Sequence, residues 1–391
     1  MFIQEEIDLN QKYFLTGGLR ADASSRVGDT DKLFLYPKFS GSVQLANFDF
    51  WEPLAGTLPQ FKLRAAFGRT GNLPNAQAKF TSLVAENIGG VGGVLVPTRR
   101  GNPDIDPETT QEVEGGVDLA FLNERGTLEV TYYRQNIADL ILENQIPTSS
   151  GFATVFVNAG DMREAALDLI PIQRSNASWQ STITFARDRS EITSLDVDPF
   201  QVGGFSLGLG QFRIEEGLSP TTIVGLDEAG TLTQFGNSNA NFQVGWNNRV
   251  SAYGFNFNML WDWKEGGDVI NLGKLITDLG GTTPDLGTEE GQARANGAGG
   301  TGRYVEDGTY LKLREISLSY NLSSSVLNRW FAGTVRELNL GVGARNLLMF
   351  TPYDGYDPEV SQFGNVAVGR AVDVLPFPSS RNLYFKVALG F

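Results

Sequence analysis

The side chains that most enzymes use for nucleophilic and metal chemistry are missing from this sequence. It contains neither cysteine nor histidine, which excludes Ser–His–Asp and Cys–His catalysis and zinc sites built on those residues. Paired carboxylates could hydrolyse glycosides, but the acidic stretches DLGTEEG and LDEAG lie in long connections, where solvated surface is their expected role. GGDVINLGKL has Leu275 where a phosphate-binding loop needs Ser or Thr. We therefore expect no catalysis, no cofactor and no metal site.

One acidic and aromatic stretch could contact a ligand instead. TPYDGYDPEV brings together Tyr353, Asp354, Tyr356 and Asp357, followed by Glu359. Aromatic rings and carboxylates side by side can stack on sugars and hydrogen-bond to them. The alternative is structural, because aspartate and proline also fix the turns of a loop. We take Tyr353, Asp354, Tyr356 and Asp357 as candidate substrate contacts, with the structural alternative open.

Composition favours an all-β envelope protein and disfavours a nucleic-acid-binding one. The formal net charge is −14, which is the wrong sign for a phosphate backbone. The sequence has 46 glycines and 11% aromatic residues, a composition that suits strands and turns. No run of about 18 apolar residues predicts a transmembrane helix. The opening MFIQEEIDLNQ has neither the basic nor the apolar region of a signal peptide.

Apolar and polar residues alternate along most of the chain, as in strands with two different faces. The stretch FNFNMLWDW shows the pattern. One face carries Phe255, Phe257, Met259, Trp261 and Trp263, and the other carries Asn256, Asn258, Leu260 and Asp262. About thirteen such segments occur, many of about 9–12 residues, which is the length of a tilted membrane-spanning strand.

The connections between these segments alternate between short and long. Short ones fall near LNQK, NERG, SNAS and AYG, with medium ones at residues 48–60 and 323–334. The long ones cover roughly residues 21–35, 70–109, 135–153, 190–240, 268–308 and 348–378. Outer-membrane barrels have this asymmetry, with short periplasmic turns and long extracellular loops. A soluble sandwich has no reason to place every long loop at one end.

The chain ends on an alternating strand, SRNLYFKVALGF. Its predicted outward face consists of Leu383, Phe385, Val387, Leu389 and the terminal Phe391. Such an ending resembles the signal that the outer-membrane assembly machinery reads. We therefore assign Phe385, Val387, Leu389 and Phe391 as a candidate barrel-assembly signal, a role that is compatible with closing the barrel wall.

Six stretches in order resemble TonB-dependent outer-membrane transporters of the SusC/RagA group. They are LRAAFGRTGN, NPDIDPETTQEVEGGVDLAFL, VNAGD, WKEGGDVIN, RYVEDGTYLKLREISLSYNL and ARNLLMFTPYDGYDPEV. The resemblance implies a plugged barrel of about 22 strands. It also implies TonB-driven import of oligosaccharides or peptides across the bacterial outer membrane, with a SusD-like lipoprotein closing the top.

The expected fold is all-β: an antiparallel meander of about thirteen strands within that larger transmembrane barrel. We expect residues 1–391 to be the C-terminal part of such a barrel, because nothing in this sequence resembles a signal peptide, a TonB box or a plug domain. The expected partners are the lipid bilayer, the SusD-like lipoprotein, the assembly machinery, and TonB through the missing N-terminal part. No nucleic acid is expected.

Two other functions stay open at this stage. The chain could be a free-standing porin-like barrel, which requires Phe2–Leu9 to pair with residues 382–391. It could also be a soluble extracellular β-protein that binds glycans, although the exposed aromatic faces argue against that.

Overall fold

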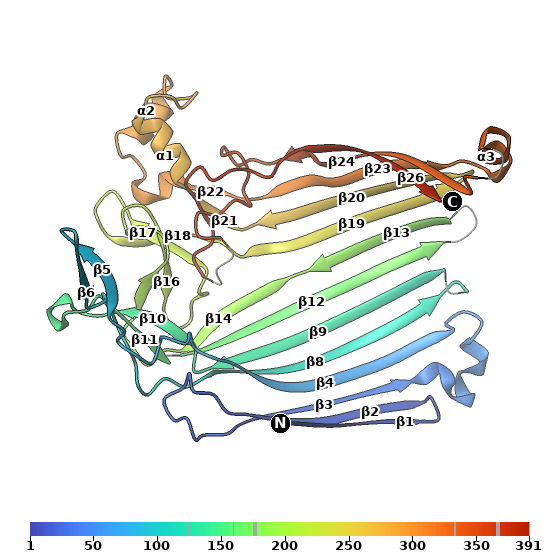
Figure 1. The fold of residues 1–391 in the computed structure, drawn as a ribbon, viewed down its shortest axis with the longest axis horizontal. Helices are drawn as coiled ribbons and strands as arrows, with labels where there is room; N and C mark the ends of the chain where they lie inside the picture. Colours follow the sequence, from blue (N-terminus) through green and yellow to red (C-terminus); the bar gives the residue numbers. More distant parts are fainter. Residues whose placement is uncertain (124, 159, 175–177, 332–333, 365–367, 391) are drawn as a thin grey trace.

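The computed structural model describes residues 1–123, 125–158, 160–174, 178–331, 334–364 and 368–390, and its main feature is one curved antiparallel sheet (Figure 1). Each strand of the sheet pairs with the strands before and after it along the path, as a meander requires. The strands in spatial order are β1 (Phe2–Leu9), β2 (Tyr13–Asp22), β3 (Phe34–Gln44), β4 (Gln60–Asn72), β8 (Glu108–Phe121), β9 (Gly126–Ala138), β12 (Asp161–Arg174), β13 (Ser178–Ala186), β19 (Ala240–Ala252), β20 (Phe255–Gly266), β23 (Tyr310–Asn321), β24 (Glu337–Phe350) and β26 (Asn382–Gly390).

The strand count agrees with the alternation in the sequence. Within the described residues the path has thirteen strands, and β14 (Asp188–Ser194) continues the course of β13 along β12. The predicted all-β antiparallel meander is therefore confirmed. Across the same residues β1 pairs only with β2 and β26 only with β24, so the sheet keeps two open edges. The pairing of Phe2–Leu9 with residues 382–391 that a free-standing barrel needs is therefore not formed by the described part of that segment, residues 382–390.

The long and short connections lie at opposite ends of the sheet, which we call the long-loop end and the short-turn end (Figure 1). The turn between β19 and β20 shows how tight the short end is, since Tyr253 and Gly254 alone connect the two strands. Both have positive φ, 52° and 85°, which matches the twist of a two-residue hairpin. Three helical segments also lie at this end: η1 (Leu45–Asn47), η2 (Asp49–Leu54) and α3 (Ser324–Phe331).

The long loops fold into small elements of their own. They contain the paired β5 (Val84–Ile88) and β6 (Val91–Leu95), and three further sheets: β10 (Ile141–Gln145), β11 (Thr154–Asn158) and β7 (Arg99–Arg100); β15 (Phe200–Val202), β16 (Gln211–Ile214), β17 (Thr222–Leu226) and β18 (Leu232–Asn237); and β22 (Val305–Asp307), β21 (Asp268–Asn271) and β25 (Val372–Asp373). Their helices are α1 (Leu272–Leu279), α2 (Glu289–Ala295), η3 (Thr148–Ser150) and η4 (Gly300–Tyr304). In the described parts of the chain, no helix is both long and apolar enough to cross a bilayer.

Buried apolar side chains gather among these loops. One cluster contains Phe212, Ile223, Ile270, Leu272 and Val372, and a second contains Ile192, Phe200 and Ile214. The loops therefore pack on one another around their own small cores. This packing gives the long-loop end fixed surfaces on which side chains can be positioned.

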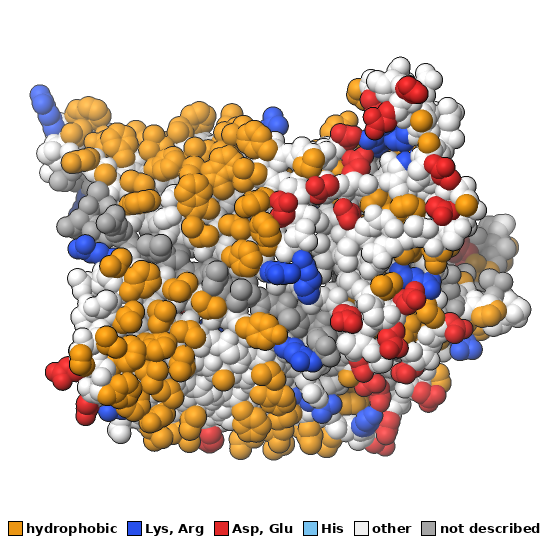
Figure 2. Space-filling view, turned by 180° about the vertical axis from the view of Figure 1, so that it is seen from behind, with side chains coloured by type: hydrophobic (Ala, Val, Ile, Leu, Met, Phe, Trp, Pro, Cys, Tyr) orange, Lys and Arg blue, Asp and Glu red, His pale blue; other side chains and the backbone are white. Residues whose placement is uncertain are grey.

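The two faces of the sheet differ in chemistry. The outer face is apolar, and Figure 2 shows its hydrophobic side chains gathered over the strands while acidic side chains gather at the long-loop end. Trp246 on β19 lies directly opposite Trp261 on β20 on this face. The inner face is polar and cross-linked, because the Arg64 Nε on β4 lies 3.0 Å from Asp118 Oδ1 on β8. Strands of this pattern suit a wall between hydrocarbon and a wet lumen.

Candidate ligand-binding site

The loop after β24, residues 351–360, carries the candidate substrate contacts at the long-loop end. Its first candidate, Tyr353, is buried, with 4% of its surface exposed. The Tyr353 hydroxyl donates a hydrogen bond to Asp373 Oδ2 on β25 at 2.7 Å. Burial and the neighbouring Asp373 carboxylate raise the pKa of Tyr353. This tyrosine joins the loop to the small sheet behind it and does not face solvent.

Asp357 is also buried and also holds the loop. Its Oδ1 lies 2.5 Å from Lys312 Nζ on β23, and its Oδ2 accepts from the Ser379 hydroxyl at 2.6 Å. Only 4% of the Asp357 side chain and 3% of the Lys312 side chain is exposed. Burial opposes ionisation of this carboxyl, but hydrogen bonds from Lys312 and Ser379 outweigh it and lower the pKa of Asp357. Both oxygens of the buried Asp357 carboxylate thus have a partner, Lys312 on one side and Ser379 on the other.

Glu359 extends this arrangement along the inner face of the sheet. Its carboxylate contacts Lys312, and Arg314 Nη1 donates to its Oε2 at 2.7 Å. Arg314 Nε also lies 2.9 Å from Asp262 Oδ2 on β20. Burial opposes ionisation of Glu359, but the bonds from Arg314 and Lys312 lower its pKa to about 2. We call Asp262, Lys312, Arg314, Asp357 and Glu359 the loop clamp, because they tie the loop to the wall.

The other two candidates, Asp354 and Tyr356, line a cavity of about 710 Å³, the outer cavity. Asp354 Oδ2 lies 2.5 Å from Lys274 Nζ, while 63% of the Asp354 side chain remains exposed. Tyr356 is 68% exposed. The facing wall supplies hydroxyl groups from Thr277, Thr282 and Thr283. The outer cavity thus combines an open aromatic ring, an accessible carboxylate and several hydroxyls.

The far wall of the outer cavity is made rigid by one arginine. Arg294 on α2 donates to both oxygens of Asp278 on α1, each at 2.9 Å, and to Asp285 Oδ2 at 2.7 Å. The hydrogen bonds from Arg294 lower the pKa of Asp278 to about 2. Tyr304 donates to the same Asp278 carboxylate at 3.1 Å. Since bidentate arginine–carboxylate pairs are strong and directional, this wall keeps its shape.

The residues that line the outer cavity are suited to binding a ligand. A sugar ring or a peptide group can stack on Tyr356 while its hydroxyl or amide hydrogens reach Asp354 and the threonine hydroxyls. Across the residues that the structure describes, no group of three acidic side chains is placed to hold a metal ion. Of the four predicted contacts, the structure therefore brings Asp354 and Tyr356 to a cavity and uses Tyr353 and Asp357 to hold the loop.

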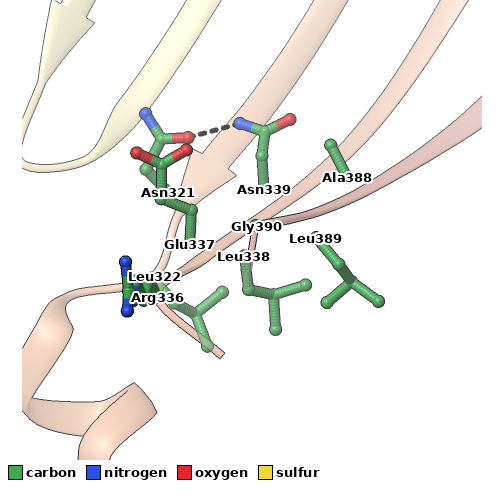
Figure 3. Close-up of a pocket in the computed structure, with 9 residues that line it drawn as sticks. All are labelled: Asn321, Leu322, Arg336, Glu337, Leu338, Asn339, Ala388, Leu389 and Gly390. Carbon is green, nitrogen blue, oxygen red and sulfur yellow. Dashed lines mark hydrogen bonds between the residues drawn. The ribbon is translucent and has the colours of Figure 1, made fainter. Parts of the chain in front are cut away.

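The candidate assembly signal lies on the last strand, at one open edge. Phe385, Val387 and Leu389 are exposed on the outer face of β26, and Phe391 falls outside the described residues. Figure 3 shows a recess at the short-turn end of this strand, where Leu338 and Leu389 point to one side and the hydrogen-bonded Asn321 and Asn339 to the other. The alternation of faces continues to the end of β26, as predicted.

The cations of this site were not predicted from the sequence. Lys312 and Arg314 lie on β23, but their partners Asp357 and Glu359 lie 45 residues further on, and Asp262, the other partner of Arg314, lies 52 residues earlier. Lys274 and the threonines near it lie in a long loop whose fold no local pattern predicts. Of these cations, only Lys312 and Arg314 could have been placed on the inner face from the sequence, because a strand that spans a membrane keeps its charged side chains on that face.

Comparison with known proteins is consistent with this geometry. A family model described as "TonB dependent receptor-like, beta-barrel" matches residues 1–347. TonB-dependent receptor P39 of Formosa agariphila is 25% identical over 476 residues, an alignment that covers 98% of this chain and 45% of the relative. TonB-dependent receptor SusC of Bacteroides thetaiotaomicron is 22% identical, over 98% of this chain and 42% of the relative.

A solved structure shows the same fold. The structure of the RagAB peptide transporter superposes with a TM-score of 0.81 at 20% identity, covering 100% of this chain and 47% of that chain. The "open-open" state of the RagAB peptide importer gives 0.75 at the same identity. The chain spans a little under half the length of the curated relatives it matches.

Proposed function

Because the chain belongs to the TonB-dependent receptor-like β-barrel family, we propose that it forms barrel wall and extracellular loops of a SusC-type importer in a bacterial outer membrane. One observation carries the proposal: the thirteen-strand meander has an apolar outer face and a polar inner face, and all its long loops lie at one end. A wall with these three properties separates hydrocarbon from water and presents its loops to the outside.

We propose that residues 1–391 supply the C-terminal part of that wall. The open edges of β1 and β26 support this, since each unpaired backbone group in hydrocarbon costs several kcal/mol. Further strands must pair with both edges for the wall to close. The candidate signal on β26 would then guide assembly, through the machinery that inserts barrels into the outer membrane.

The relatives support a proposal about the cargo and the partners. We propose that an oligosaccharide or a peptide is imported, that TonB supplies the energy through the rest of the transporter, and that a SusD-like lipoprotein covers the long-loop end. The outer cavity is the proposed contact for this cargo on the present chain. Asp354 and Tyr356 support that role because they are the exposed members of the predicted set.

The test is uptake of labelled oligosaccharides and peptides by cells that carry the protein, with and without TonB. We expect uptake that stops when TonB is disrupted. Tyr356→Ala should lower uptake, whereas Tyr253→Ala should not, because Tyr253 is 97% exposed but lies in a short turn at the other end. Uptake that continues without TonB would favour a passive pore and overturn the proposal.

A further inference from the structure

A second cavity, of about 550 Å³, lies between the inner face of the wall and the loops folded over it. None of the residues of the loop clamp or of the outer cavity lines it. The wall side comes from the long-loop ends of β8, β9, β12 and β14, and the roof comes from the loop before β10, from β16 and from the segment before β17. We call it the inner-face cavity.

The wall of the inner-face cavity breaks the alternation seen elsewhere. Along β9 the inner face carries polar side chains such as Gln135, which donates to Glu112, but Ile137 takes the next inner position. Met162 lies opposite Ile137 on one side and Ile192 on the other, so three apolar residues form a ladder across adjacent strands. An inner face that meets water has no need of such a ladder, and apolar contact explains it better.

The roof continues the apolar surface. Leu140, Ile141, Leu142 and Ile214 contribute from the loops, and Ile192 and Ile214 belong to one buried cluster. The loops therefore pack against part of the ladder and leave the rest facing the cavity. The result is an apolar chamber with amide and hydroxyl groups of Asn72, Asn239 and Thr221 among its lining residues.

One charged group faces this chamber. Among the described residues that line it, Glu108 at the start of β8 is the single one with a formal charge. Its Oε2 accepts from the Ile141 backbone N–H at 3.3 Å, and no lysine or arginine lines the cavity with it. A carboxylate beside an apolar surface is stabilised by a cation that brings its own hydrogen-bond donors. The ligand that fits this cavity best is therefore mostly apolar and carries one positive charge.

We propose that the inner-face cavity binds the amino-terminal end of a peptide whose first side chains are apolar, with the α-ammonium at Glu108. An anionic ligand would meet the Glu108 carboxylate, and an unsubstituted oligosaccharide would leave the apolar ladder without contacts. The inference rests on the proposed importer function only in that cargo must reach the inner face from outside.

The test is direct binding to the protein purified in detergent from outer membranes that contain it. The probe is the dipeptide Leu-Phe-amide, which has one ammonium and two apolar side chains. We expect N-acetyl-Leu-Phe-amide to bind about tenfold more weakly or worse, since it loses a hydrogen bond between charged groups. Gly-Gly-amide, which keeps the charge and lacks the apolar groups, should bind more weakly than Leu-Phe-amide.

Three substitutions locate the effect. Glu108→Gln keeps an acceptor for the Ile141 N–H and should weaken Leu-Phe-amide about tenfold while leaving the acetylated dipeptide unchanged. Glu112→Gln is the matched control, because Glu112 lies on the same face of β8 outside the cavity lining, and it should change neither affinity. Leu73→Trp should fill the cavity and weaken both dipeptides.

Equal binding of the two dipeptides, or a Glu108→Gln variant that binds like the wild type, would overturn the inference. The outcome is separable from that of the proposed function. TonB-dependent uptake without binding of Leu-Phe-amide removes this inference and keeps the importer. Binding with the expected Glu108 dependence, but without TonB-dependent uptake, keeps the site and removes the importer.

Discussion

Replacing Lys312 with methionine should release the loop that carries Tyr356. Lys312 contacts two carboxylates, Asp357 and Glu359, and its side chain and that of Asp357 are almost completely buried. Methionine keeps the length and apolar character of the lysine stem but removes the ammonium. The substitution therefore tests the charge interaction with little change in packing.

The expected loss of stability depends on the hydrogen bonds that each carboxylate keeps after the substitution. Removing one partner of a buried ion pair costs about 3–5 kcal/mol. Asp357 keeps hydrogen bonds from the Ser379 hydroxyl and the Glu359 backbone N–H, and Glu359 keeps Arg314, so we expect the lower limit. A loss of about 3 kcal/mol raises the equilibrium constant for loop opening by about a hundredfold.

Hydrogen exchange of two loop amides measures this opening. The Glu359 N–H donates to Asp357 Oδ1 at 3.0 Å, and the Val360 N–H donates to the Asp357 carbonyl at 3.2 Å. Both amides should exchange about a hundredfold faster in the Lys312→Met variant. Asp354→Asn is the control, because its side chain is 63% exposed and such a surface pair contributes about 0–1 kcal/mol.

The reasoning fails if Lys312→Met changes these exchange rates less than about fivefold. It also fails if Asp354→Asn accelerates them as much as Lys312→Met does. Either result would mean that packing, and not the buried charges of the loop clamp, holds the loop.

Three further outcomes are expected. Met259→Arg should destabilise the complete barrel by about 2–4 kcal/mol in a refolding assay, whereas Asn258→Arg, on the inner face, should be mild; equal effects would contradict the assigned faces. Arg294→Met should open the wall of the outer cavity to proteolysis, because it leaves the buried Asp278 carboxylate without its cation. The pKa of Glu359 is lowered from 4.5 to about 2, so its contribution is complete above pH 4.5 and is lost as the pH falls toward 2; Val360 exchange, corrected for its intrinsic rate, should rise only below pH 4.5.

The sheet was predictable because its information is local. Alternation in a stretch such as FNFNMLWDW defines the face of every residue, and the lengths of the connections define which end they occupy. The faces of β20 and the order of the thirteen strands therefore agree with the prediction. Strand pairing between chain neighbours needs no knowledge of the rest of the fold.

The loop clamp and both cavities were not predictable because they depend on contacts between distant loops. Lys312 and Asp357 are 45 residues apart, and Arg294 on α2 contacts Asp278 on α1 across the loop of residues 280–288. The sequence of residues 351–360 allowed both a contact role and a structural role. In the structure, the buried Tyr353 and Asp357 hold the loop, whereas Asp354 and Tyr356 stay exposed for the proposed contact role. Composition alone could not separate the two pairs, because the distinction depends on which side chains are buried.

The charged side chains on the inner face of β4 also affect which strand register is stable. Lys62 and Arg64 on β4 both point inward, and Arg64 reaches Asp118 on β8. If β4 entered one residue out of register, both cations would turn toward the acyl chains, where each costs about 2–4 kcal/mol near the midplane. The out-of-register pairing of β4 is thus disfavoured in energy, so the ion pair that cross-links the finished wall also helps to specify the register of its strands.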